Sequence, residues 1–177
     1  MWKIYVLVAI DHFSRKVVAV TPLEGPNTGR VIDALEKAFE IHGKPKHLIS
    51  DQGSVFTSAA FREFLGANNI KIRYGAIGEH GSVAVTERVI ETLKYEWLKK
   101  VPVIRGYRHL TQLCTSFTEW YNNWRPHEYL RNTTPAMAFQ NKVVPLVPKN
   151  AKDVPIELEI KRFKETRVTG FRIKKVA

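Results

Sequence analysis

Leu48-Ile49-Ser50-Asp51-Gln52-Gly53-Ser54-Val55-Phe56-Thr57-Ser58 is the most informative stretch of the sequence. Its apolar start predicts a short buried strand over residues 47–50, and Asp51 follows directly before a glycine turn. In α/β proteins, functional groups gather at the carboxyl ends of strands. Asp51 is therefore a candidate site residue, although Asp-x-Gly is also a common turn sequence with no chemical role.

Hydrophobic periodicity on either side of this stretch predicts an alternation of strands and helices. A helix capped by Asn27 or Thr28 and stopped by Gly43 precedes the stretch. Ser58 can cap a further helix, and Thr134-Pro135 can start a short one. The order of elements is that of an α/β fold. The expected strands cover residues 2–10, 16–22, 47–50 and 70–74, and the longer helices cover residues 28–42, 83–100 and 107–124.

The composition indicates a basic protein that meets a polyanion. The chain carries 28 Lys and Arg against 17 Asp and Glu, which gives a formal charge of +11. Nucleic acid is the first candidate partner for such a charge, and a basic surface without a partner is the alternative. The single cysteine, Cys114, excludes an internal disulfide and favours a reducing, cytosolic compartment. The apolar run near the start is too short to span a bilayer, so no membrane is expected.

Glu87 is the partner expected for Asp51. Thirty-five residues separate the two, and Glu87 lies in a predicted helix that follows a glycine-rich, mobile loop over residues 75–81. Glu91 and Lys94 follow at the fourth and seventh positions, so the three side chains share one helix face. An ordinary solvated stripe of charges is the alternative interpretation of that face. The opposite face is expected to pack inward through Val89, Ile90, Leu93 and Trp97.

The helix predicted over residues 107–124 is rich in aromatic side chains. A stacking surface for nucleic acid could be formed by Trp120, Tyr121, Trp124, Arg125 and His127. Helical spacing favours core packing for Tyr121 and Trp124 instead, because it places them on one apolar face with Leu110, Leu113, Cys114 and Phe117.

Together these features resemble the integrase core superfamily, with bacterial insertion-sequence transposases as the most similar branch. The acidic triad of that superfamily is Asp, Asp and Glu, and its last two members have the spacing of Asp51 and Glu87. Gln52 departs from the Asn that is usual in these transposases. The resemblance covers about residues 2–140 and rests on four ordered blocks, VAIDHFSRK (8–16), SDQGSVF (50–56), GSVAVTERVIETLK (81–94) and WYNNWRPH (120–127) with TPA (134–136).

The resemblance implies a ribonuclease H-like α/β fold, with a mixed sheet flanked by helices, and metal-dependent phosphoryl transfer at DNA ends. Asp51 and Glu87 would be the second and third catalytic carboxylates and would bind two Mg²⁺ or Mn²⁺ ions. Lys94 and Arg88 would contact DNA near the active site. The protein would act as a homo-oligomer on element ends and target DNA, in the bacterial cytoplasm and at the nucleoid.

The resemblance also implies that one carboxylate of the triad is missing. In the superfamily, the first catalytic Asp ends a strand that precedes the segment beginning here at Trp2, so the first strand of the sheet is expected to be absent as well. Asp11 matches the turn of the Asp-x-x-Ser-Arg block, a position that is not a metal ligand. Because two carboxylates cannot easily hold two divalent ions, we expect catalysis by this chain to be impaired.

The end of the chain is expected to form a separate segment. Residues 1–142 would be the catalytic core with its C-terminal helices, and residues 143–177 a proline-containing linker with a basic β tail. Alternating apolar and charged residues predict a β-hairpin there, with a frayed tail as the alternative.

Two other functions stay open at this point. One is that of a non-catalytic DNA-binding remnant of a transposase, and the other is that of a ribonuclease H-type nuclease acting on RNA–DNA hybrids.

Overall fold

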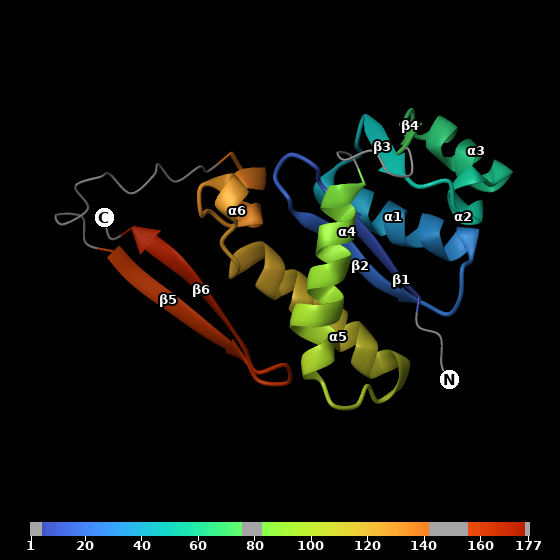
Figure 1. Cartoon of the computed structure of the whole chain (residues 1–177). Coiled ribbons are helices and arrows are strands. Elements are labelled where there is room, and N and C mark those ends of the chain that lie inside the picture. The colour runs from blue at the N-terminus through green and yellow to red at the C-terminus, as the bar shows by residue number, and fades with distance from the viewer. Residues whose placement is uncertain (1–4, 76–82, 142–155, 176–177) are drawn as a thin grey trace. The chain divides into compact units, whose positions relative to one another are not determined.

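The structure is a computed structural model, and it describes residues 5–75, 83–141 and 156–175 (Figure 1). Most of the predicted loop at 75–81 and the whole predicted linker at 143–155 lie outside these residues. The order of strands and helices confirms the α/β class. The elements are β1 (Tyr5–Ile10), β2 (Val17–Leu23), α1 (Thr28–His42), β3 (His47–Ser50), α2 (Ser54–Thr57), α3 (Ala59–Ala67), β4 (Lys71–Tyr74), α4 (Ala84–Glu91), the π-type segment η1 (Thr92–Trp97), the 3₁₀ segments η2 (Leu98–Lys100) and η3 (Glu128–Leu130), α5 (Gly106–Asn123), α6 (Pro135–Phe139), β5 (Ile156–Phe163) and β6 (Val168–Lys175).

The chain divides into two compact units, Met1–Ala9 with Val18–Glu91 and Ile10–Val17 with Thr92–Ala177. In the first unit β1 pairs with β2, and β3 pairs with β4 in parallel, with Leu48 opposite Ile72 and Ser50 opposite Tyr74. Helices α1 and α3 supply most of the apolar core of this unit. The buried core residues are Leu7, Val31, Ala34, Leu35, Phe61, Phe64, Leu65 and Ile70.

Local signals determine the ends of the helices in this unit as the sequence predicts. The Asn27 side chain accepts the Arg30 N–H and caps α1, so Asn27 rather than Thr28 is the cap. Gly43 ends α1 with a φ of 87°, a left-handed conformation that glycine adopts at little cost. Ser58 caps α3 by accepting the Phe61 N–H at 3.2 Å. The end of α1 at Gly43 is followed by β3, and Asp51 comes directly after this strand.

The helix predicted over residues 83–100 is confirmed, but its geometry is not uniform. It is α-helical as far as Glu91, π-type from Thr92 to Trp97 and 3₁₀ from Leu98 to Lys100. A π-turn places more residues in each turn than an α-turn does. Of the residues predicted to face inward, Val89, Leu93 and Trp97 are almost fully buried, whereas Ile90 is half-buried. Trp97 is anchored where its Nε1 donates to the Leu113 carbonyl at 2.9 Å.

Helix α5 is the centre of the second unit. Its buried face consists of Leu110, Leu113, Cys114, Phe117, Trp120 and Tyr121, which confirms the predicted core packing of Tyr121. Trp124 does not continue this face, because it is the half-buried residue at which α5 ends. Burial raises the pKa of the Cys114 thiol to about 12, which agrees with a packing role for this side chain. None of the helices in the described ranges has the length and apolar character needed to cross a membrane.

Strands β5 and β6 form an antiparallel hairpin that packs against α5, so the alternative of a frayed tail is wrong. The Phe171 N–H donates to the Trp124 carbonyl at 2.9 Å. Phe163 meets the Trp97 ring edge to face, with ring centroids 5.3 Å apart. The hairpin is therefore an integral part of the second unit.

A carboxylate strengthens this attachment. Glu119 of α5 accepts hydrogen bonds from Trp124 Nε1 at 2.9 Å and from Lys161 Nζ at 3.0 Å. Burial alone would raise the pKa of Glu119, but the hydrogen bonds from Trp124 and Lys161 outweigh it and lower the pKa. Glu119 thus stays ionised and links the end of α5 to β5.

Candidate catalytic and DNA-binding site

Asp51 is exposed at the carboxyl end of the parallel β3–β4 pair. The Gly75 N–H donates to the Ser50 carbonyl at 2.9 Å, which extends the strand pairing up to the residue before Asp51. Asp51 Oδ1 accepts the Gly53 N–H at 3.0 Å and so closes the turn. Across the described residues no second hydrogen bond to this carboxylate is present, which leaves Oδ2 available to a cation.

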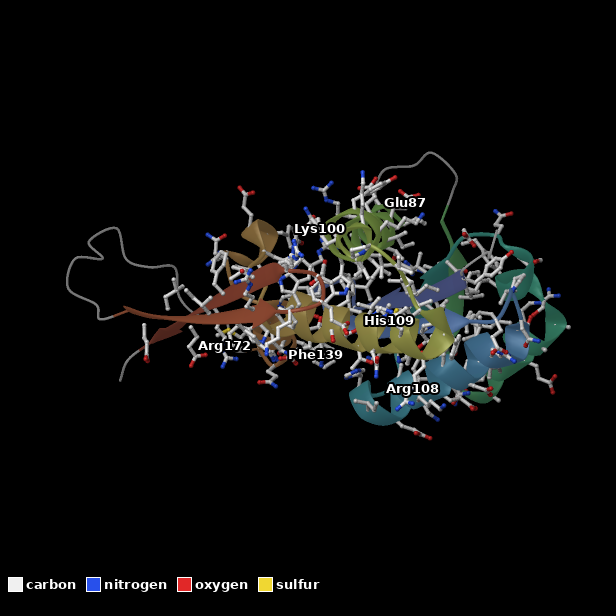
Figure 2. All side chains as sticks on the ribbon, turned by 90° about the horizontal axis from the view of Figure 1, so that it is seen from below. Glu87, Lys100, Arg108, His109, Phe139 and Arg172 are labelled. Atoms are coloured by element: carbon white, nitrogen blue, oxygen red, sulfur yellow. The ribbon has the colours of Figure 1, made fainter. Side chains whose placement is uncertain are left out.

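Glu87 lies in the first turn of α4, and its side chain is exposed (Figure 2). An acid in this position interacts favourably with the positive end of the helix dipole. Arg88 and Glu91 form an ion pair at 3.5 Å with both side chains mostly exposed, so the pair contributes only about 0–1 kcal/mol. The acidic groups of α4 are therefore solvated rather than fixed in a buried network.

Asp51 and Glu87 belong to the same compact unit, and both carboxylates are on its surface. Carboxylate oxygens are the ligands that Mg²⁺ and Mn²⁺ prefer, so the chemistry of these two groups fits such ions. In the described part of the chain, no group of three or more His, Cys, Asp or Glu is arranged to hold a metal ion. That Asp51 and Glu87 share a cation therefore stays a prediction.

Lys94 is exposed in the π-type segment η1 and belongs to the second unit. The predicted face shared with Glu87 and Glu91 assumed a uniform α-helix, and that assumption fails at Thr92, where the π-type geometry begins. A role of Lys94 and Arg88 in DNA binding stays a prediction.

Asp11 closes a turn, as the sequence predicts. Its Oδ1 accepts both the Ser14 N–H at 2.8 Å and the Ser14 hydroxyl. Ser14 is almost fully buried, and Arg15 next to it has a φ of 61°. Both hydrogen bonds end on Oδ1, so this oxygen of Asp11 serves the turn expected for the Asp-x-x-Ser-Arg block.

Asn122 has a structural role that sequence reasoning missed. Its side-chain amide accepts the Val17 N–H at 2.9 Å and donates to the Val17 carbonyl at 2.8 Å. The two partners lie 105 positions apart in the chain, so no local pattern could reveal the contact. The signal was the presence of Asn122 in the block WYNNWRPH, to which no role was given.

His127 also interacts with the segment before Val17, through the charge of Arg15. Burial, followed by the charges of Arg125 and Arg15, lowers the pKa of His127 to about 4. Arg125 donates to both carboxylate oxygens of Glu96 at 3.1 and 3.2 Å. Arg15 and Val17 thus both interact with residues of the block at 120–127, and these interactions are structural.

Two family models match parts of the chain. One family described as integrase core domain matches residues 1–80, and a second family with the same description matches residues 68–135. An uncharacterized protein of the insertion element IS136 from Agrobacterium fabrum is 24% identical over 143 residues, which cover 76% of this chain and 73% of that protein. A putative transposase of IS986/IS6110 from Mycobacterium tuberculosis is 25% identical over 138 residues, which cover 74% of this chain and 50% of that protein.

An uncharacterized protein of Caenorhabditis elegans is 32% identical over 133 residues, which cover 75% of this chain. The chain therefore spans very different shares of its relatives, from 10% of the nematode protein to 50% of the mycobacterial one and 73% of the Agrobacterium one.

Solved structures give the same fold. The catalytic core domain of the HTLV-2 integrase, solved with magnesium in a trimeric form, superposes with a TM-score of 0.62 at 22% identity over 77% of this chain and 84% of that chain. The catalytic core of the BIV integrase gives a TM-score of 0.64 at 18% identity over 78% and 87%. The chain therefore has the ribonuclease H-like fold of an integrase catalytic core. The two integrase core matches, the insertion-element relatives and this fold together support an integrase or transposase core of the Asp-Asp-Glu type.

Proposed function

We propose that this chain serves DNA transposition, through an integrase core that carries out metal-dependent phosphoryl transfer at DNA ends. The observation that supports this most is the position of Asp51, an exposed carboxylate at the carboxyl end of the β3–β4 pair with one oxygen not used by the turn. The similarity to integrase cores and insertion-sequence transposases supplies the reaction class.

Asp51 and Glu87 are the two acids of this proposal. Asp51 would hold a divalent cation through Oδ2 while the Gly53 N–H fixes Oδ1. Glu87 would supply oxygen ligands from the first turn of α4. When bound, Mg²⁺ or Mn²⁺ ions activate the attacking hydroxyl and stabilise the leaving oxygen of a phosphodiester. Arg88 and Lys94, both exposed cations, would position phosphates.

Catalysis by the 177-residue chain alone is proposed to be impaired. A pair of divalent ions would need more carboxylate ligands than two residues supply. Asp51 and Glu87 provide two carboxylates, and Asp11 is engaged by Ser14. A DNA-binding role without cutting is the second candidate, favoured by the net charge of +11.

The metal site is tested by titrating Mn²⁺ into the chain and following free Mn²⁺ by electron paramagnetic resonance. Asp51→Asn and Glu87→Gln are each expected to weaken binding at least severalfold, whereas Glu63→Gln, which removes an exposed acid of α3, leaves it unchanged. Equal binding by the wild type and both site variants would refute the assigned ligands.

The catalytic claim is tested by nicking of supercoiled plasmid in Mn²⁺. We expect the wild-type chain to nick the plasmid no more than the Asp51→Asn variant does. Nicking that disappears in this variant would show that the impairment claim is wrong and the assignment of Asp51 right. Cleavage of an RNA–DNA hybrid but not of duplex DNA would replace the proposal with a ribonuclease.

DNA binding is tested by fluorescence anisotropy across a series of salt concentrations. Lys94→Gln and Arg88→Gln should each reduce the salt dependence by about one counterion, if each contacts one phosphate. Lys37→Gln, on the exposed side of α1, is the control.

The partners and location of the protein follow from the same proposal. The catalytic cores of HTLV-2 integrase were solved in dimeric and trimeric forms, which supports a homo-oligomer on DNA. Relatives encoded by bacterial insertion elements support action in the cytoplasm, at the nucleoid.

A further inference from the structure

A surface cavity of about 320 Å³ lies at the start of α5 in the second unit. It is bounded by the connection between η2 and α5 and by the turn of the β5–β6 hairpin. The cavity has a predominantly apolar wall and three ionisable groups. Its lining residues are Val101, Pro102, Val103, Arg105, His109 and Glu165.

His109 is the group that gives this cavity a chemical character. The side chain is 10% exposed, and its Nδ1 accepts the Arg105 N–H at 2.9 Å. Because Nδ1 is an acceptor, the neutral imidazole carries its proton on Nε2. Nε2 is buried and has no hydrogen-bond partner among the residues that the structure describes. A buried donor without an acceptor is costly, so this atom indicates a ligand or partner group.

Glu165 is the acceptor next to this donor. Its Oε2 lies 3.6 Å from His109 Nε2, which is beyond hydrogen-bond distance, and its side chain is 52% exposed. The exposed carboxylate can rotate away from Nε2 and leave both groups facing one ligand. A metal ion is a poor candidate for that ligand, because Nε2 carries the proton and has no lone pair to offer.

The rest of the cavity fits a flat ring flanked by phosphates. Val101, Pro102 and Val103 form an apolar wall, and the guanidinium of Arg105 can stack on a base. Lys99 and Lys100 directly precede the apolar wall in the sequence, and Arg108 precedes His109 on α5. Figure 2 labels Lys100 and Arg108. All three are exposed cations suited to phosphate. A volume of about 320 Å³ is within the range of small-ligand sites.

We propose that this cavity binds an unpaired guanine base of DNA, an inference that rests on the proposed action on DNA. The Watson–Crick edge of guanine has the O6 acceptor followed by the N1–H and 2-amino donors. O6 would accept from His109 Nε2–H, and the two donors would pair with the Glu165 carboxylate. Adenine, cytosine and thymine each offer an acceptor beside one donor group, so guanine makes one more hydrogen bond.

The test uses fluorescence anisotropy with a short hairpin duplex that ends in a three-nucleotide single strand. The central base of the strand is guanine, adenine or inosine, which lacks the 2-amino group. The wild-type chain is expected to bind the guanine probe roughly tenfold more tightly than the adenine probe, with inosine between them. Glu165→Gln should abolish the preference, because an amide cannot accept both donors.

His109→Asn provides the second variant. Asn Oδ1 can replace Nδ1 as the acceptor of the Arg105 N–H, but its short side chain leaves no donor at the position of Nε2. It should lose the guanine preference while keeping the melting temperature close to that of the wild type. Glu157→Gln, on the exposed part of the same hairpin, should keep the preference.

The outcomes separate this inference from the function on which it rests. Equal affinity of the wild type for guanine and adenine, with salt-dependent binding intact, overturns the guanine site and leaves the proposed DNA function standing. A guanine preference that survives both Glu165→Gln and His109→Asn also overturns the site. Absence of binding to every probe overturns both proposals.

Discussion

Gly170 of β6 lies so close to Trp124 that a Cβ on residue 170 would come within 2.4 Å of the Trp124 Cβ atom. The same Cβ would lie 3.1 Å from Trp120 Cδ1 and from the Trp124 carbonyl oxygen. Only a residue without a side chain permits this approach, and the Phe171 N–H can then reach the Trp124 carbonyl. The contact fixes the hairpin on the end of α5.

Gly170→Ala is therefore expected to dislodge the hairpin. Overpacking of this kind costs about 1–3 kcal/mol of unfolding free energy, measured by urea titration. Hydrogen exchange should show faster exchange of the Phe171 amide. Gly66→Ala is the matched control, because nothing lies within 4 Å of its Cβ position in α3. It should be neutral or stabilising, by up to about 1 kcal/mol. Equal effects of the two substitutions would contradict the packing argument.

Asn122→Ala should destabilise the second unit by roughly 2–4 kcal/mol, because it leaves the N–H and C=O of Val17 buried without their partners. Chemical denaturation measures the loss. Asn123→Ala removes only a side-chain bond to Glu119 at a half-buried position and should cost less than about 1 kcal/mol. A smaller loss at Asn122 than at Asn123 would show that the amide does not hold Val17.

His127 should make stability depend on pH. Its pKa is lowered to about 4 in the folded chain, below the ordinary value of 6.5, so the unfolded chain binds the proton more tightly. The stabilisation is fully present above pH 6.5 and is lost as pH falls towards 4. The loss amounts to about 3 kcal/mol at most.

Unfolding titrations between these pH values measure the effect. His127→Gln should remove this part of the pH dependence, whereas His12→Gln, at an exposed turn position, should keep it. An unchanged slope in His127→Gln would assign the effect to other groups.

Gly53→Ala should weaken the proposed cation site without unfolding the chain. A Cβ at this position would lie 3.0 Å from Asp51 Oδ1, so the carboxylate must shift by a few tenths of an ångström. We expect a severalfold loss of Mn²⁺ affinity, because ligand position matters to a hard cation. Ser54→Ala, at the next residue, serves as the control. Unchanged Mn²⁺ binding in Gly53→Ala would separate Asp51 from the metal.

Features that depend on interactions between residues close in the sequence were predicted correctly. Caps such as Asn27 and Ser58 and the short strand before Asp51 lie where the pattern placed them, because their hydrogen bonds are formed within a few residues. Asp51 and Glu87 were named from their spacing within a family pattern. Their common cation is not tested by the described residues, and neither is the division of the chain at residue 142.

Tertiary contacts account for what the sequence did not predict. The π-type geometry after Glu91 accompanies the burial of Leu93 and Trp97 against distant residues, which α-helical periodicity does not encode. The attachment of the hairpin depends on Gly170, whose contribution is the absence of a side chain. Neither the π-type geometry nor the close approach at Gly170 can be predicted from residues that are near each other in the sequence.

The amide of Asn122 also affects how the chain meets other molecules. It takes up one donor and one acceptor of Val17, the two groups that a neighbouring strand would use. The first residue of β2 therefore offers no template to an incoming extended peptide at that position. The Asn122 side chain of α5 thus occupies the backbone groups of Val17 and opposes strand-to-strand aggregation at this position.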